Sequence, residues 1–127
     1  MRAQLTLAEA AAAHPDGTMS ILRAGFDRVY GERAPYPLNA ALVIRIKSEM
    51  GDVGKHRFDI KGLDEDGASI LPALEGEFEV AKGGGTSAFI LGMHVVFEKS
   101  GTYVFVLRVD NVQLDDWTIH VGQRHAS

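Results

Sequence analysis

The stretch FEKSGTYVF, residues 97–105, decides the fold class of this chain. Its Ser100-Gly101 pair is a turn signal, and apolar residues occupy every second position on both sides of it. The preceding alternation covers residues 89–97, and the following one covers residues 103–109. A period of two over this length predicts two half-buried strands joined by a turn.

The same alternation recurs through the rest of the chain, at residues 40–47, 56–61, 77–80 and 117–121. Turn signals rich in glycine, aspartate and proline separate these runs, and 14 of the 127 residues are glycine. Short strands at fairly even spacing are typical of a β-sandwich or barrel. We therefore expect one all-β domain over residues 1–127. It should be an antiparallel β-sandwich of about seven to nine strands with at most one short helix.

The N-terminal stretch AAAHPDGTMSILRAG, residues 11–25, leaves two structures open. Its alanines favour a helix, but a helix over residues 5–13 is too short to persist by propensity alone. No helix follows Gly17, so the turn lacks the helix N-terminus that a phosphate-binding loop needs. We expect strand, turn and strand, with a short helix over residues 9–13 as the alternative.

The segment GTYVF, residues 101–105, resembles the G-x-Y-x-C entry to the late central strand of immunoglobulin-like sandwiches. Tyr103 stands at the tyrosine of that motif, and Phe105 takes the place of the cysteine. The resemblance implies an immunoglobulin-like topology, in which the Tyr103 hydroxyl donates a hydrogen bond to the backbone before its strand. We expect structural roles for Gly101, Tyr103, Phe105 and Trp117.

Tyr103 is expected to differ from the other two tyrosines. Pro35 and Pro37 mark residues 31–37 as an exposed, extended loop. Tyr30 and Tyr36 lie in or beside that loop, so both are expected to be exposed.

Most of the chain also resembles a family of small bacterial and phage-borne all-β proteins of unknown function. The resemblance rests on LTLAEAAAAHPDGTMSILRAGFDRVY (residues 5–30), on the mid-chain hydrophobic strands, and on FEKSGTYVFVLRVDNVQLDDWTIHV (residues 97–121). It implies a β-sandwich, and it transfers no catalytic residues to this chain.

The composition argues against several classes of protein. The absence of cysteine rules out disulfides, thiolate metal sites and a cysteine nucleophile. A formal net charge of −4, with basic residues scattered singly, argues against nucleic-acid binding. No apolar run is long enough to span a membrane, and the N-terminus lacks the order of a signal peptide. We expect a cytoplasmic protein, or a component of a phage particle, that binds neither nucleic acid nor membrane.

Two loop motifs contain residues typical of ligand sites. DEDG, residues 64–67, overlaps part of a calcium loop, but no carboxylate follows until Glu75, so a hairpin turn is favoured. KGGGTS, residues 82–87, has neither the order of a phosphate-binding loop nor a following helix. We expect a flexible hairpin loop there, which orders against a partner through Gly83, Gly84 and Gly85.

The histidines do not form a local metal-binding pair, because no H-x-H, H-x-x-x-H or H-E-x-x-H pattern occurs. They are His14, His56, His94, His120 and His125. Of these, His94 and His120 lie in expected strands and are candidates for meeting across a sheet. The carboxylates Asp115 and Asp116 are placed in an expected turn, where solvent-exposed acids need no function. We expect no metal, no cofactor and no catalytic site.

These observations together favour a non-enzymatic structural or protein-interaction module. We expect it to self-associate as a homo-oligomer, or to pack into a larger assembly such as a phage particle. Edge strands and small apolar residues would supply the surface, namely Ala11, Ala12 and Ala13. One alternative is a small-ligand site near the 83–85 loop, and another is a hydrolase or lyase that uses His94 or His120.

Overall fold

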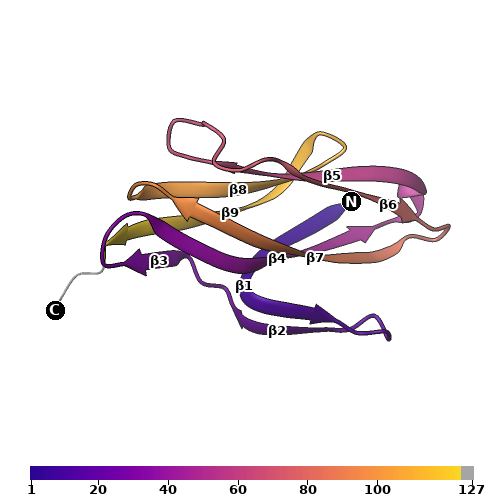
Figure 1. The fold of residues 1–127 in the computed structure, drawn as a ribbon. Coiled ribbons are helices and arrows are strands. Elements are labelled where there is room, and N and C mark those ends of the chain that lie inside the picture. Colours follow the sequence, from indigo (N-terminus) through magenta and orange to yellow (C-terminus); the bar gives the residue numbers. More distant parts are fainter. Residues whose placement is uncertain (124–127) are drawn as a thin grey trace.

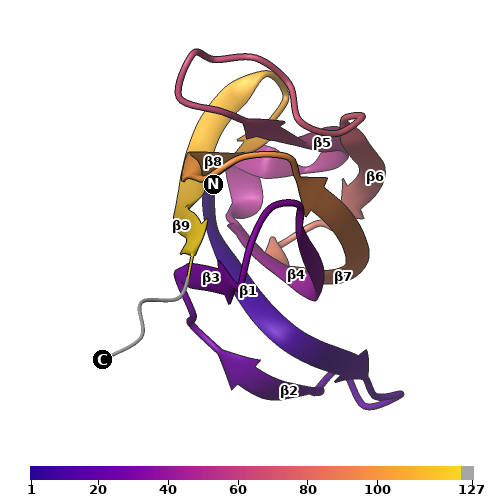
Figure 2. The ribbon, with the colours of Figure 1, turned by 60° about the vertical axis from the view of Figure 1, so that its left-hand side comes forward.

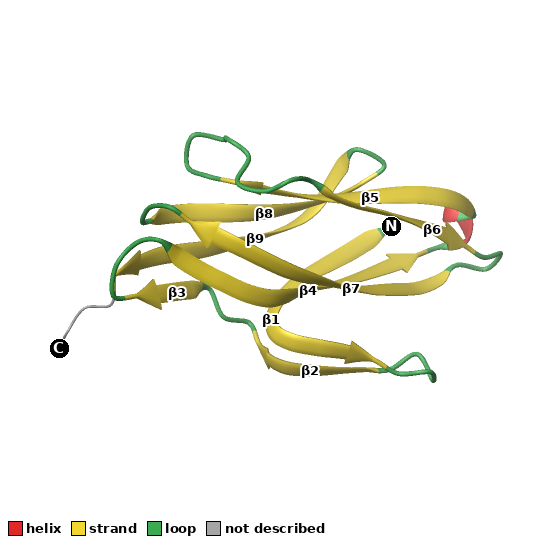
Figure 3. Ribbon diagram, in the orientation of Figure 1, coloured by secondary structure: helices red, strands yellow, loops and turns green. Residues whose placement is uncertain are grey.

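Nine strands and one short 3₁₀ turn make up residues 1–123, the part of the chain that the computed structural model describes (Figure 1 and Figure 3). They form two stacked sheets, as the alternating pattern predicts. One sheet has the strand order β2-β1-β4-β7, and the other has the order β3-β9-β8-β5-β6. The elements are β1 (Arg2–Ala13), β2 (Met19–Ala24), β3 (Arg28–Gly31), β4 (Tyr36–Ser48), η1 (Met50–Asp52), β5 (Gly54–Leu63), β6 (Leu74–Val80), β7 (Gly85–Phe97), β8 (Gly101–Val109) and β9 (Val112–Gln123). The described residues contain no helix that is long and apolar enough to cross a membrane.

The pairing of the described strands is antiparallel except at one edge, where β3 and β9 run parallel. The expectation of a purely antiparallel sandwich is wrong at this edge. Antiparallel neighbours are joined by short turns, whereas parallel neighbours need a long connection. β3 and β9 lie near opposite ends of the chain, so five intervening strands provide that connection.

The longest pairing joins β4 to β7 along their full lengths, from Tyr36 opposite Phe97 to Ser48 opposite Gly85. β4 is buried on both faces at residues 40–44 and alternates between exposed and buried beyond them. This is the pattern expected from residues 40–47, whose second face turns polar as the strand proceeds.

The core lies between the two sheets and is filled by their inward-facing side chains. Phe105 and Leu107 of β8 are completely buried there, as are Ile44 and Ile46 of β4. Phe97, Leu7, Leu42, Ile60 and Ile119 are also fully or almost fully buried. Large apolar side chains that interdigitate from two inner faces are what hold a sandwich together, because their burial removes apolar surface from water.

Tyr103 makes the hydrogen bond that its sequence motif implies. Its hydroxyl donates to the backbone carbonyl of Lys99 over 2.6 Å, while its ring packs on Phe97 with centroids 4.6 Å apart. Burial raises the pKa of the Tyr103 hydroxyl, so the donor proton is retained. Trp117 also bridges segments, because its indole Nε1–H donates to the Phe26 carbonyl over 3.0 Å.

Tyr36 is buried, contrary to the expectation that it would be exposed. Only 4 % of the residue is accessible, and its hydroxyl lies 3.3 Å from Ser100 Oγ. The reason is that β4 begins at Tyr36 and directs this side chain inward, so the loop is confined to residues 32–35. Tyr30 is 47 % exposed, as expected.

Candidate functional site

The β1–β2 hairpin extends beyond the sandwich as an arm. The first half of β1 pairs with β4, from Arg2 opposite Lys47 to Ala8 opposite Ala41, and the second half pairs with β2 alone. Both Figure 1 and Figure 2 show this second half and β2 lying away from the two stacked sheets. The alanines of residues 10–13 are therefore in a strand, which excludes the helical alternative. We use "the arm" for residues 8–24.

The arm presents small and apolar side chains on both faces. One face carries Ala11 opposite Ile21 and Ala13 opposite Met19; the other carries Ala10 opposite Leu22. Ile21 is 41 % exposed and Leu22 is 61 % exposed. A lone two-stranded hairpin is at best marginally stable in water, and in residues 10–13 and 19–22 the two strands of the arm pair only with each other.

The arm is shaped at both ends by polar contacts. At its tip, Asp16 accepts hydrogen bonds from the hydroxyl and then from the backbone N–H of Thr18, which lower the pKa of the Asp16 carboxyl. At its base, Arg23 pairs with Glu9 over 3.8 Å beside a hollow of about 220 Å³ that is also lined by Phe26. These contacts fix the ends of the hairpin and leave its middle without charge.

The two sheets differ in how their edge strands are protected. In the five-stranded sheet, β3 is four residues long, and β6 carries Glu75, Glu77 and Glu79. Short length and charge both discourage edge-to-edge pairing. In the four-stranded sheet, the edge strand β7 has 13 residues without any Asp, Glu, Lys or Arg, and β2 carries only Arg23. Both edges of this sheet are thus open to another strand.

The 83–85 loop closes a small cavity at the end of β4. Gly84 has a φ of +81°, and a Cβ there would lie 2.5 Å from the Ser48 carbonyl oxygen, so this close approach requires glycine. The cavity measures about 140 Å³ and is bordered by Ser48, whose buried Oγ has no hydrogen-bond partner among the described residues. Sites for organic ligands typically measure about 300–1,000 Å³.

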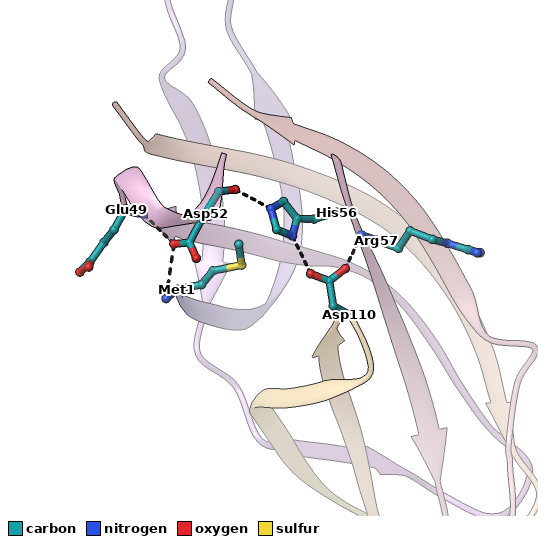
Figure 4. Close-up of polar contacts among 6 residues, drawn as sticks. All are labelled: Met1, Glu49, Asp52, His56, Arg57 and Asp110. Carbon is teal, nitrogen blue, oxygen red and sulfur yellow. Dashed lines mark hydrogen bonds and ion pairs between the residues drawn. The ribbon is translucent and has the colours of Figure 1, made fainter. Parts of the chain in front are cut away.

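The most connected polar cluster centres on His56 of β5 (Figure 4). His56 Nδ1 lies 2.5 Å from Asp110 Oδ2, and Nε2 lies 2.6 Å from the Asp52 carbonyl oxygen. The imidazole also stacks on Phe78, with centroids 5.4 Å apart. Asp110 is held in turn by the backbone N–H of Arg57 over 3.1 Å.

This cluster saturates the imidazole of His56. Both ring nitrogens face oxygens that accept, so the protonated ring satisfies both contacts. The hydrogen bond to Asp110, followed by the one to the Asp52 carbonyl, raises the pKa of His56. The hydrogen bond between His56 and Asp110 lowers the pKa of the Asp110 carboxyl. A ring without a free lone pair is suited to holding strands together, and not to proton abstraction or metal binding.

Sequence reasoning missed this cluster because its members are far apart in the chain. His56 and Asp110 are 54 positions apart, and no spacing rule connects them. The signal available in the sequence is the pair Asp110-Asn111, because both residue types favour turns. In the structure their φ values of 49° and 67° are typical of a tight two-residue hairpin. That turn places Asp110 at the end of β8, beside the neighbouring strand β5.

His94 and His120 do not meet across a sheet. They lie in β7 and β9, which belong to different sheets, and both are exposed. His94 contacts Asn39 Oδ1, and His120 Nδ1 lies 3.2 Å from Thr102 Oγ1. His125 lies outside the described residues. Within residues 1–123 no group of three or more His, Asp or Glu side chains is arranged to hold a metal ion.

The acidic 64–67 segment is a tight turn. Asp64 Oδ1 accepts from the backbone N–H groups of Asp66 and Ala68, each over 2.9 Å. Gly67 has a φ of +80°, as the hairpin interpretation requires. The oxygen Oδ1 is therefore occupied by the backbone of its own turn.

Asp115 and Asp116 are in β9 and not in a turn, which corrects the expectation. Asp115 Oδ2 accepts a hydrogen bond of 2.7 Å from the backbone N–H of Leu5, so it ties β9 to the free edge of β1. The alternation of Trp117, Ile119 and Val121 begins after this pair, which is why the pair itself resembled a turn.

The comparison with protein families places the chain by sequence. Residues 4–122 match a family described as "Family of unknown function (DUF6941)", and the chain belongs to that family. No curated protein matches the chain, and no solved structure matches it.

Proposed function

We propose that this member of the DUF6941 family is a non-enzymatic structural subunit that associates with further copies of itself. The arm supplies one contact, and the free edge of β7 in another copy supplies the other. The observation that carries the proposal is the arm itself, which exposes Ile21 and Leu22 on a two-stranded ribbon outside the sandwich. A cytoplasmic or phage-particle location, without nucleic acid or membrane as partner, is part of the proposal.

The chemistry of the two edges supports a second copy as the partner. β2 and β7 are the opposite edges of one sheet, and neither carries a row of alternating glutamates like the one that discourages pairing at β6. If β2 of one copy pairs with β7 of the next, the sheet continues from subunit to subunit. Val96 of β7 is 40 % exposed and offers apolar surface to Leu22 of the incoming strand. Because β2 and β7 are different surfaces, this pairing is head-to-tail, and head-to-tail contacts produce either closed rings or open filaments.

We further propose that the sandwich has immunoglobulin-like topology. In support, β1, β4 and β7 correspond to strands A, B and E, and β5, β8 and β9 correspond to C, F and G. The tyrosine of the corner motif belongs near the start of strand F, which is the position of Tyr103 in β8. In this scheme β2 is an added strand, so the arm is an elaboration of the common fold.

The two alternative functions have less support. The cavity beneath the 83–85 loop is below the volume of a typical organic-ligand site. A carboxylate within hydrogen-bond reach of the imidazole would favour a hydrolase or lyase that uses His94 or His120. Among residues 1–123, the imidazole of His94 contacts the amide of Asn39, and that of His120 contacts the hydroxyl of Thr102.

Light scattering on the purified chain tests the proposal. We expect the wild-type mass to be a multiple of 13.8 kDa and the mass of Leu22→Lys to fall towards the monomer, because a charge is placed on the pairing edge. Val112→Lys is the matched control, since Val112 is 59 % exposed on β9 in the other sheet. A monomeric wild type, or equal effects of Leu22→Lys and Val112→Lys, would refute self-association through the arm.

A further inference from the structure

A second surface feature, separate from the arm, is a hollow of about 530 Å³ against the first residues of β1. Its lining includes Arg2, Arg45 and Lys47, together with Ala3 and Thr86. The three basic residues are exposed, and the volume is within the range of small-molecule sites.

The strand register gathers these three positive charges on one face. Arg2 lies directly opposite Lys47 in the β1–β4 pair, and Arg45 lies two residues along β4 on the same face. Like charges placed directly opposite each other are destabilising. Within residues 1–123 none of the three has an ion-pair partner. A chain of net charge −4 thus concentrates uncompensated positive charge here.

The edge of β1 that faces away from β4 also offers a backbone donor. The N–H of Leu5 points away from β4, because it donates to Asp115 Oδ2 over 2.7 Å. Donors on one edge of an antiparallel strand recur at every second residue, so the N–H of Ala3 points to the same side. At Leu5 the chain places its own carboxylate on this edge. At Ala3, which lines the hollow, the charged side chains of the lining are the cations Arg2, Arg45 and Lys47 instead.

We infer that this hollow binds a phosphate group, either inorganic phosphate or the phosphate of a small organic ester. Guanidinium groups bind phosphate oxygens in a bidentate manner, and the ammonium of Lys47 adds a further charge-assisted donor. The Ala3 N–H and the Thr86 hydroxyl complete a set of donors without an acidic side chain in the lining. A bound dianion also offsets the repulsion between Arg2 and Lys47. The inference does not depend on self-association.

The test is a chemical-shift titration of the ¹⁵N-labelled full chain with inorganic phosphate, adenosine monophosphate and citrate. We expect saturable shifts at the amides of residues 2–4 and 45–47 with both phosphates. Arg45→Gln should weaken this binding at least about tenfold, because a charge-assisted contact is lost. Lys61→Gln, an exposed lysine on β5 in the other sheet, should leave the affinity unchanged.

Three results would overturn the inference: no shift at these amides with either phosphate, equal weakening by Lys61→Gln and Arg45→Gln, or tighter binding of citrate than of both phosphates. Tighter binding of adenosine monophosphate than of phosphate would support the inference and identify the ligand as an organic ester. Equal binding would support it with free phosphate as the ligand. Both variants change exposed side chains, and a thermal melt checks that they remain folded.

Discussion

Tyr103 links β8 to the preceding loop through one hydrogen bond, which a single substitution separates from the packing of the ring. Tyr103→Phe keeps the contact with Phe97 and removes the donor to the Lys99 carbonyl. We expect the free energy of unfolding to fall by about 1–2 kcal/mol, since a partly buried acceptor loses its partner. Denaturant unfolding, or a melting-temperature drop of several degrees, would measure this loss.

Tyr30→Phe is the matched control for this substitution. Tyr30 is 47 % exposed, and its hydroxyl accepts a hydrogen bond from the exposed Arg28. We expect a change below about 0.5 kcal/mol, as is usual at surface positions. Tyr36→Phe is not a suitable control because Tyr36 is buried. Equal unfolding midpoints for Tyr103→Phe and Tyr30→Phe would contradict the structural role of Tyr103.

His56 makes the stability of the fold depend on pH, and the direction of its pKa shift fixes the sign of that dependence. Its pKa is raised in the folded state by Asp110 and the Asp52 carbonyl. The stability it contributes is therefore complete below the unfolded pKa of about 6.5 and is lost as the pH rises through the folded value. We expect the melting-temperature difference between wild type and His56→Gln to be larger at pH 6 than at pH 9, about the range in which a histidine titrates. A difference that stays constant over this range would contradict the charged contact.

At the scale of elements, the sequence predicted strands well because most strands bury one face. The alternations at residues 56–61 and 103–109 became β5 and β8, with Phe58, Ile60, Phe105 and Leu107 buried. The prediction was weakest where the burial pattern is not regular. The alanines of β1 have little hydrophobic contrast, so helix and strand stayed open until the pairing with β2 was known.

The candidate sites were harder to predict because they depend on contacts between distant segments. Asp115 resembled a turn residue, yet its role is to bind the Leu5 N–H from the other end of the chain. The arm could not be foreseen either, since the sequence marks strands but not the point at which β1 leaves β4. Local pattern determines the element, whereas the long-range partner determines the site.

The β6–β7 loop allows a sharp test of a close backbone approach. Gly84→Ala places a Cβ 2.5 Å from the Ser48 carbonyl oxygen at a φ of +81°. We expect it to cost more than about 2 kcal/mol of unfolding free energy, because a steric clash adds to the left-handed conformation. Gly83→Ala, whose φ is +99° and whose Cβ meets nothing within 4 Å, should cost about 1–2 kcal/mol from the conformation alone. Equal losses would show that the Ser48 contact is unimportant.

At the scale of the whole molecule, the two sheets differ in the length and charge of their edge strands. The five-stranded sheet has short or charged edges, while the four-stranded sheet ends in the exposed β2 and the uncharged β7. A monomeric sandwich in which only one sheet has edge strands protected by charge or short length would be prone to aggregation through edge-to-edge pairing of the other sheet. The association that we propose through the four-stranded sheet would give both edges a partner and would support the arm.

Hydrogen–deuterium exchange of the arm at several protein concentrations tests this account most directly. In a monomer the β2 backbone of residues 19–24 has one open edge, and its lone hairpin should open and exchange rapidly. We predict that peptides covering residues 8–24 are protected at high concentration and lose protection on dilution, while those covering β8 stay protected throughout. Arm exchange that is equally fast at every concentration would contradict self-association through the arm.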